Sequence, residues 1–251
     1  MKKMAALMMA ALLFTLCGCS IFSFSSDDEE QSFSAEYTIR TTAKPTEVFF
    51  DVPYSESVIT EEATRAYRSD ALDFTELRQL FSDSVFADSD DTLHMWQNQI
   101  RYCIEGATSS ADTNELSEIS RELISVSGFP GMRETTQSDA NVYIRFTDDV
   151  KSSVTLETDS SGVVHSGTII IPNVLPTDKR KALLEQSVMQ LCGFEDTVHT
   201  QLDSVLRIDA PSDSLTEVDL ILLDILYGEM QPGMTRSACL YIFDAHFKEN
   251  N

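Results

Sequence analysis

Basic side chains are scarce in this sequence. It contains 18 Lys and Arg residues against 41 Asp and Glu residues, which gives a formal net charge of −23. A surface with this balance repels the phosphates of nucleic acid and of anionic lipid headgroups, so we expect no nucleic-acid partner. The need to stay soluble explains the excess of acidic residues without an acidic docking site.

Several motifs of known chemistry are missing. The sequence has no C-x-x-C pair, no glycine-rich phosphate loop, and neither G-x-S-x-G nor S-x-x-K. These absences argue against a dithiol redox centre, a nucleotide-phosphate site and the common serine nucleophiles. Besides Cys17 and Cys19, the chain contains Cys103, Cys192 and Cys239. Three thiols fit either buried free cysteines or one disulfide with one free thiol.

No apolar run is long enough to span a bilayer, and the first one has the features of an export signal. Lys2 and Lys3 precede an apolar run of about a dozen residues that ends at Leu-Cys-Gly-Cys. This ending resembles a bacterial lipobox, in which cleavage leaves a cysteine that is then lipidated, here Cys19. We therefore predict a signal peptide at 1–18 and an extracytoplasmic protein, lipid-anchored to a bacterial membrane at the cell surface or in the periplasm.

The rest of the chain divides into a linker and one domain. Residues 19–46 are rich in Ser, Thr and acids without a sustained hydrophobic period, which predicts a disordered linker after the lipidated cysteine. Residues 47–251 are enough for a single domain with a sizeable core. Hydrophobic periodicity and capping residues predict an α+β domain in which a small mixed sheet packs on helices. The expected strands lie at 47–52, 93–104, 141–146, 152–158 and 163–172, and the expected helices at 73–86, 112–127, 177–192 and 216–228.

The stretch "QSVMQLCGFED" has the spacing of a zinc-peptidase helix, H-E-x-x-H-x-x-G-x-x-H. Gly193 stands where the glycine of that pattern belongs, although a helix C-cap alone would also explain it. Asp196 stands at the third ligand position. Gln186, Ser187 and Gln190 replace the two histidines and the glutamate, so we expect no metal or other cofactor and no catalytic residue here.

The segments that follow extend this resemblance. "DSVLRI" lies where a metzincin has its methionine turn, with Leu206 in place of the methionine, and "LTEVDLILLDILYG" looks like the last helix of a matrixin-type catalytic domain. Over about residues 71–234 the chain resembles the bacterial domain of unknown function 2927 family, through Trp96 with "NQIRYCIEG", "DANVYIRF", "QLCGF", the same "LTEVDLILLDILY" and "QPGM". The resemblance implies a zincin-like domain with a degenerate metallopeptidase motif.

Other metal ligands are few. The four histidines never fall at the spacing of three to five residues typical of zinc ligands. A cluster of His165, Asp196 and His199 could form only through the fold. A metal-dependent peptidase or hydrolase with such unconventional ligands is therefore the alternative function, and an envelope assembly or sensing module on another α+β fold is a third.

The leading prediction is a membrane-anchored lipoprotein whose zincin-like domain is catalytically inactive and serves binding or a structural role. If it binds a partner, we expect an extended peptide or an envelope protein to pair with a free strand edge in the former substrate cleft. That edge is predicted at Gly167, Thr168, Ile169, Ile170 and Ile171.

Overall fold

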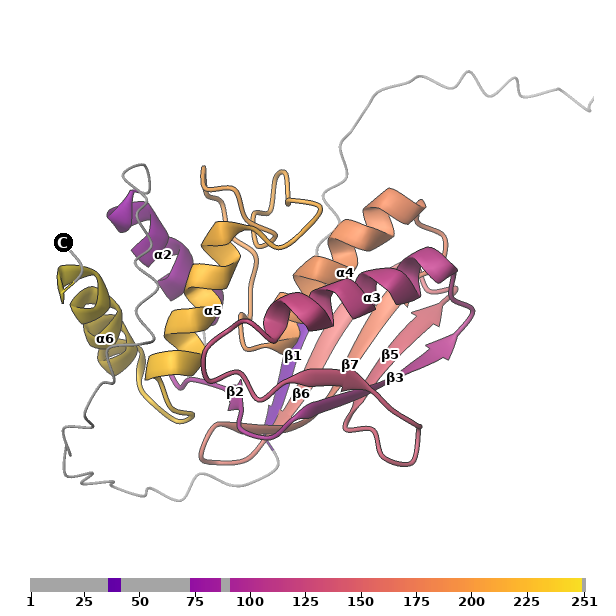
Figure 1. Cartoon of the computed structure of the whole chain (residues 1–251), viewed down its shortest axis with the longest axis horizontal. Coiled ribbons are helices and arrows are strands. Elements are labelled where there is room, and N and C mark those ends of the chain that lie inside the picture. Colours follow the sequence, from indigo (N-terminus) through magenta and orange to yellow (C-terminus); the bar gives the residue numbers. More distant parts are fainter. Residues whose placement is uncertain (1–35, 42–72, 87–90, 250–251) are drawn as a thin grey trace, which may run out of the picture. The chain divides into compact units, whose positions relative to one another are not determined.

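The computed structural model describes residues 36–41, 73–86 and 91–249, all of them within the compact unit Ser32–Asn251 (Figure 1). The predicted signal peptide, Cys19 and the strand expected at 47–52 lie outside the described residues. Among the described helices, none combines the length and the apolar character needed to cross a membrane.

Seven strands of the described residues form one sheet in the order β1-β6-β7-β5-β3-β4, and β2 pairs with the start of β7. All neighbouring strands are parallel except β6 and β7, which form the predicted antiparallel hairpin. The strands are β1 (Glu36–Thr41), β2 (Met95–Trp96), β3 (Ile100–Gly106), β4 (Met132–Glu134), β5 (Val142–Thr147), β6 (Ser153–Thr158) and β7 (Val163–Pro172).

Five helices complete the described part of the domain, so the predicted class, an α+β domain with a small mixed sheet packed on helices, is confirmed. Strand β1 corrects one boundary, because it lies inside the predicted linker 19–46 and pairs with β6. The helices are α2 (Phe74–Val85), α3 (Ser110–Leu123), α4 (Thr177–Leu191), α5 (Glu217–Glu229) and α6 (Arg236–Glu249).

Helices α2, α3 and α5 begin at residues whose side chains satisfy free backbone N–H groups, whereas α4 follows Pro176 without a side-chain cap. Asp73 caps α2, and Thr216 with Asp219 forms a capping box on α5, both as predicted. Helix α3 begins earlier than predicted. Ser109 is its N-cap, and Asp112, the third residue of the helix, completes the capping box with Ser109. Ser109 lies three residues ahead of Asp112, the expected start of the helix.

Helices α3 and α4 cover one face of the sheet (Figure 1). Period-2 alternation supplies the apolar side chains that meet them, including the buried Ile144, Leu156 and Ile169. Gly167 on β7 allows α4 to approach closely, since a Cβ there would lie 2.9 Å from Leu191 Cδ1. The close packing of α4 on β6 and β7 therefore depends on the missing side chain at Gly167.

Helix α6 was not predicted from the sequence. Its segment contains the β-prone run Ala-Cys-Leu-Tyr-Ile-Phe, which masks the helical spacing of two buried residues, Cys239 and Phe243. Phe243 stacks on Phe81 of α2 with ring centroids 4.9 Å apart. Arg78 of α2 pairs with Asp244 at 2.6 Å. Tertiary packing against α2 therefore selects the helix.

Candidate functional site

The predicted site lies on helix α4, whose second half is buried. Every residue from Leu183 to Leu191 is buried in the domain. The helix ends in a Schellman motif, in which Phe194 N–H donates to Met189 O and Gly193 N–H donates to Gln190 O. Gly193 has φ +106°, and a Cβ there would lie 2.5 Å from His94 O. Helix termination and close packing therefore account for this glycine without any reference to metal binding.

Two aromatic side chains hold the end of α4 in place. The indole Nε1–H of Trp96 donates to Leu191 O at 2.7 Å, and the hydroxyl of Tyr227 donates to Cys192 O at 2.9 Å. These bonds satisfy carbonyls that a helix end leaves free. Cys192 is completely buried, and desolvation raises the pKa of its thiol, so it is a core residue rather than a nucleophile.

The three substituted motif positions lie inside the protein. Gln186 and Gln190 are one helical turn apart, and with Ser187 they have exposed fractions of 2 % or less. The Gln186 side-chain amide donates from Nε2 to Val205 O at 3.1 Å. The segment containing Leu206 therefore passes beside the helix at Gln186, as the predicted arrangement requires.

The Val205 segment is itself held by Asp219, a fully buried carboxylate of α5. Its Oδ1 accepts from Ser204 Oγ at 2.5 Å and its Oδ2 from Val205 N at 3.2 Å. The same carboxylate accepts from Thr216 N at 2.9 Å within the capping box. A chain of hydrogen bonds therefore runs from α5 through Val205 to Gln186, which gives the motif position a structural partner.

Asp196, at the third ligand position of the degenerate pattern, is exposed. Its carboxylate accepts from Thr197 N at 2.7 Å, and its own N–H donates to Ser84 O of α2. The preceding residue points inward, where Glu195 Oε1 lies 2.9 Å from His94 Nδ1, with both side chains less than 5 % exposed. Because the Glu195 side chain is buried, the side chain of the next residue, Asp196, points toward solvent.

The cluster of His165, Asp196 and His199, on which the alternative of an unconventional metalloenzyme depended, does not form among the described residues. His165 Nε2 lies 2.7 Å from Asp159 Oδ2, beside the β6–β7 turn, and His199 Nδ1 lies 2.5 Å from Asp209 Oδ1. Within the described ranges no three His, Cys, Asp or Glu side chains gather so that they could hold a metal ion.

The residues at the positions that match the two histidines and the glutamate of the zinc-peptidase pattern do not fit zinc. Zinc in proteins is held by imidazole, thiolate or carboxylate groups. Gln186 and Gln190 offer neutral amide oxygens, and Ser187 lacks the basicity to deprotonate a metal-bound water. Gln186 Oε1, Ser187 Oγ and Gln190 Oε1 are buried and accept no hydrogen bond from the described residues. These three positions thus offer a metal ion only polar, uncharged groups.

Glu185 immediately precedes the motif in sequence, and it faces another helix. It is 2 % exposed, and burial together with the neighbouring Glu115 of α3 raises its pKa to about 9. At neutral pH the folded protein therefore carries Glu185 as an uncharged acid. An uncharged acid cannot act as a general base, so Glu185 does not replace the missing glutamate.

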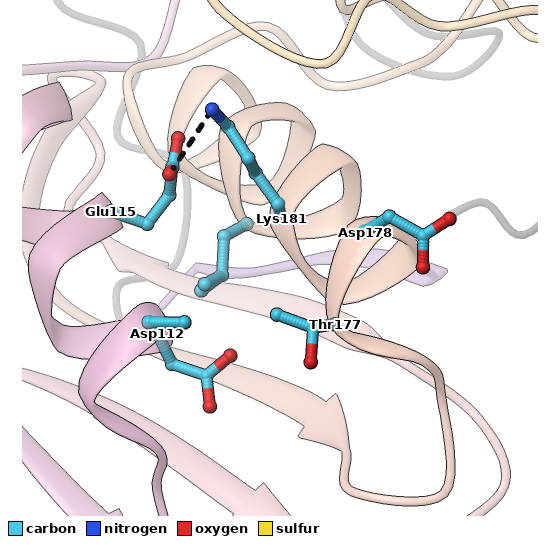
Figure 2. Close-up of a pocket in the computed structure, with 7 residues that line it drawn as sticks. Asp112, Glu115, Thr177, Asp178 and Lys181 are labelled. Atoms are coloured by element: carbon cyan, nitrogen blue, oxygen red, sulfur yellow. Dashed lines mark ion pairs between the residues drawn. The ribbon is translucent and has the colours of Figure 1, made fainter.

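A hollow of about 450 Å³ lies between the first turns of α3 and α4 (Figure 2). Two of its acidic side chains already have partners. Asp112 receives Arg180 Nε at 2.9 Å, and Glu115 lies 3.4 Å from Lys181 Nζ. The ion pairs connect α3 to α4, and we assign them a structural role.

The predicted peptide-binding edge is wrong. Residues Gly167 to Ile171 belong to β7, which pairs with β5 on one side and with β6 on the other. Its backbone N–H and C=O groups are already used in the sheet, so the strand cannot accept an additional peptide. The ends of the sheet order are β1 and β4.

No family model and no curated protein sequence matches this chain. Among solved structures, the chain is similar to high choriolytic enzyme 1, a hatching-enzyme zinc-protease from the Medaka fish Oryzias latipes. The TM-score is 0.35 and the identity 10%, over 53% of this chain and 94% of that one.

Proposed function

We propose that this chain is a zincin-like domain in which the metal-binding helix has become a structural element of the core. The domain then serves a binding or structural role and does not hydrolyse peptides through this helix. Three features support the proposal: α4 packs on the sheet, Gly193 ends it, and the segment containing Leu206 passes beside it.

The hydrogen bond from Gln186 to Val205 O is the observation that carries the proposal. In a metallopeptidase the side chain at this position presents a lone pair to the metal. Here the Gln186 side-chain amide instead donates a hydrogen bond from Nε2 to the backbone Val205 O, at 3.1 Å. Its function in the fold is to hold the Val205 segment against α4, which is a structural task.

Metal content and peptidase activity of the full chain in detergent test the proposal. After dialysis against zinc, plasma mass spectrometry is expected to find no stoichiometric zinc. No chelator-sensitive cleavage of casein is expected. Asp196→Ala and His199→Ala are the matched variants, since they remove the remaining ligand candidates. One zinc per chain that either variant loses, with chelator-sensitive cleavage, would show that the chain is an unconventional metalloenzyme.

We further propose that the domain is displayed outside the cytoplasm on a lipid-modified Cys19. The support is the short apolar run after Lys2 and Lys3 and its Leu-Cys-Gly-Cys ending. Mass spectrometry of the membrane fraction is expected to find an acylated N-terminal Cys19. Cys19→Ser should abolish the acyl mass while Cys17→Ser preserves it, and an intact Met1 on the membrane-bound protein would contradict the proposal.

A further inference from the structure

A second hollow, of about 400 Å³, lies at the start of strands β3 and β7. Its floor includes the buried Trp96 and Val164. Its basic side chains are Arg101, Arg133 and His165, and none of the lining residues from the described part of the chain is acidic. We call this feature the arginine hollow. In a chain with more than twice as many acidic as basic residues, this is an unusual concentration of positive charge.

The two arginines are placed side by side by the sheet. Arg101 on β3 and Arg133 on β4 are direct register partners in parallel strands. Neighbouring strands are about 4.8 Å apart, so two like charges are held close together. Such a pair is destabilising unless an anion lies between or beside the guanidinium groups.

Neither arginine is neutralised within the described ranges. Arg101 forms no ion pair and no side-chain hydrogen bond there, and Arg133 donates only to the neutral amide oxygen Gln99 Oε1, at 2.8 Å. The third basic residue of the lining, His165, has its Nε2 2.7 Å from Asp159 Oδ2. By contrast, Arg145 of the same sheet pairs with Glu105 at 2.8 Å. The uncompensated charge is therefore confined to Arg101 and Arg133.

The backbone around the arginines is braced by a polar side chain. Asn141 donates from Nδ2 to Gln99 O at 3.0 Å and accepts from Arg101 N at 2.7 Å. Gln99 in turn holds the Arg133 guanidinium through its Nε. The backbone at Arg101 and the guanidinium of Arg133 are thus held before any ligand arrives, which lowers the entropy lost on binding.

We propose that the arginine hollow is a binding site for an oxyanion, either a carboxylate or a phosphate group of a small ligand. A guanidinium presents parallel N–H donors that match the paired oxygens of both groups. Arg101 and Arg133 supply the charge, and the amides of Asn98 and Gln99 on the rim offer further hydrogen bonds to the ligand. The site is distinct from helix α4 and does not depend on its proposed structural role.

Isothermal titration of the full chain at low ionic strength tests this site, because salt screens exposed charges. Inorganic phosphate and succinate are titrated separately, which distinguishes the two oxyanion sources. At least one is expected to bind, and Arg101→Gln with Arg133→Gln should weaken that binding by about tenfold or more. Both arginines are exposed and repel each other, so the double variant is expected to melt at a temperature no lower than the wild type.

Arg145→Gln is the matched control. It removes one exposed arginine from the same face of the sheet, where it is already paired with Glu105, and should leave the affinity for the anion unchanged. An equal loss of affinity in Arg145→Gln would mean that only general positive charge is sensed. That result, binding that survives the double variant, or no binding of either anion would overturn the assignment.

Discussion

Glu185→Gln is the most informative perturbation of the contact between α3 and α4. In the folded protein Glu185 is 2 % exposed and meets Glu115, and desolvation followed by that contact raises its pKa to about 9. In the unfolded chain the pKa is close to the ordinary value of 4.5. The folded state therefore holds a proton that the unfolded state releases across this range of pH.

The sign and size of the effect follow from proton linkage. The contribution of Glu185 to stability is fully present below its unfolded pKa and is lost as pH rises toward its folded pKa. Within that window the free energy of unfolding falls by about 1.4 kcal/mol per pH unit. From about pH 5 to about pH 8 the loss is at most about 4 kcal/mol, and relaxation of the helices reduces it. Gln at this position carries no titratable proton.

Urea unfolding of the wild type and Glu185→Gln at several pH values measures the effect directly. The difference in free energy of unfolding between the two proteins is the readout, since titrations common to both cancel. We expect the free energy of unfolding of Glu185→Gln to increase relative to that of the wild type as pH rises. Glu118→Gln, an exposed change on α3, is the control and should show no such trend. A difference that stays constant from about pH 5 to about pH 8 would refute the reasoning.

Three further predictions concern residues around α4. Asp219→Ala should lower the free energy of unfolding by about 3 kcal/mol or more, because it leaves the Ser204 hydroxyl and the Val205 N–H unpaired in the core. Urea denaturation measures this change, and a loss below about 1 kcal/mol would contradict the prediction. Gly193→Ala should cost about 2 kcal/mol or more, since φ is +106° and the new methyl group meets a carbonyl; an unchanged thermal midpoint would refute this. Gln190→Met removes a buried acceptor without a described donor and should raise stability by up to about 1 kcal/mol in the same assay, whereas a clear loss would indicate that Gln190 binds a ligand.

Local patterns were sufficient for most elements of the described domain. The capping residues Asp73, Thr216 and Asp219 are where the sequence placed them, and Gly193 ends α4 as predicted. Caps and glycine stops can be recognised because they act within one or two turns of the chain. The substituted motif positions could be assessed in the same way, because the chemistry of a Gln or Ser side chain does not depend on the fold.

Long-range pairing decided the rest. Period-2 alternation predicts a strand at residues 163–172 but carries no information about its neighbours, so the prediction of a free edge at residues 167–171 was wrong, because β5 and β6 enclose β7. In the same way, 32 residues of sequence separate Arg101 from Arg133, and only the parallel register of β3 and β4 brings them together. The inward turn of Glu185 toward Glu115 depends on how α3 crosses α4. Hydrophobic period and capping are properties of a segment, whereas strand order, register and helix contacts depend on which segments bury each other, and only the tertiary structure determines that.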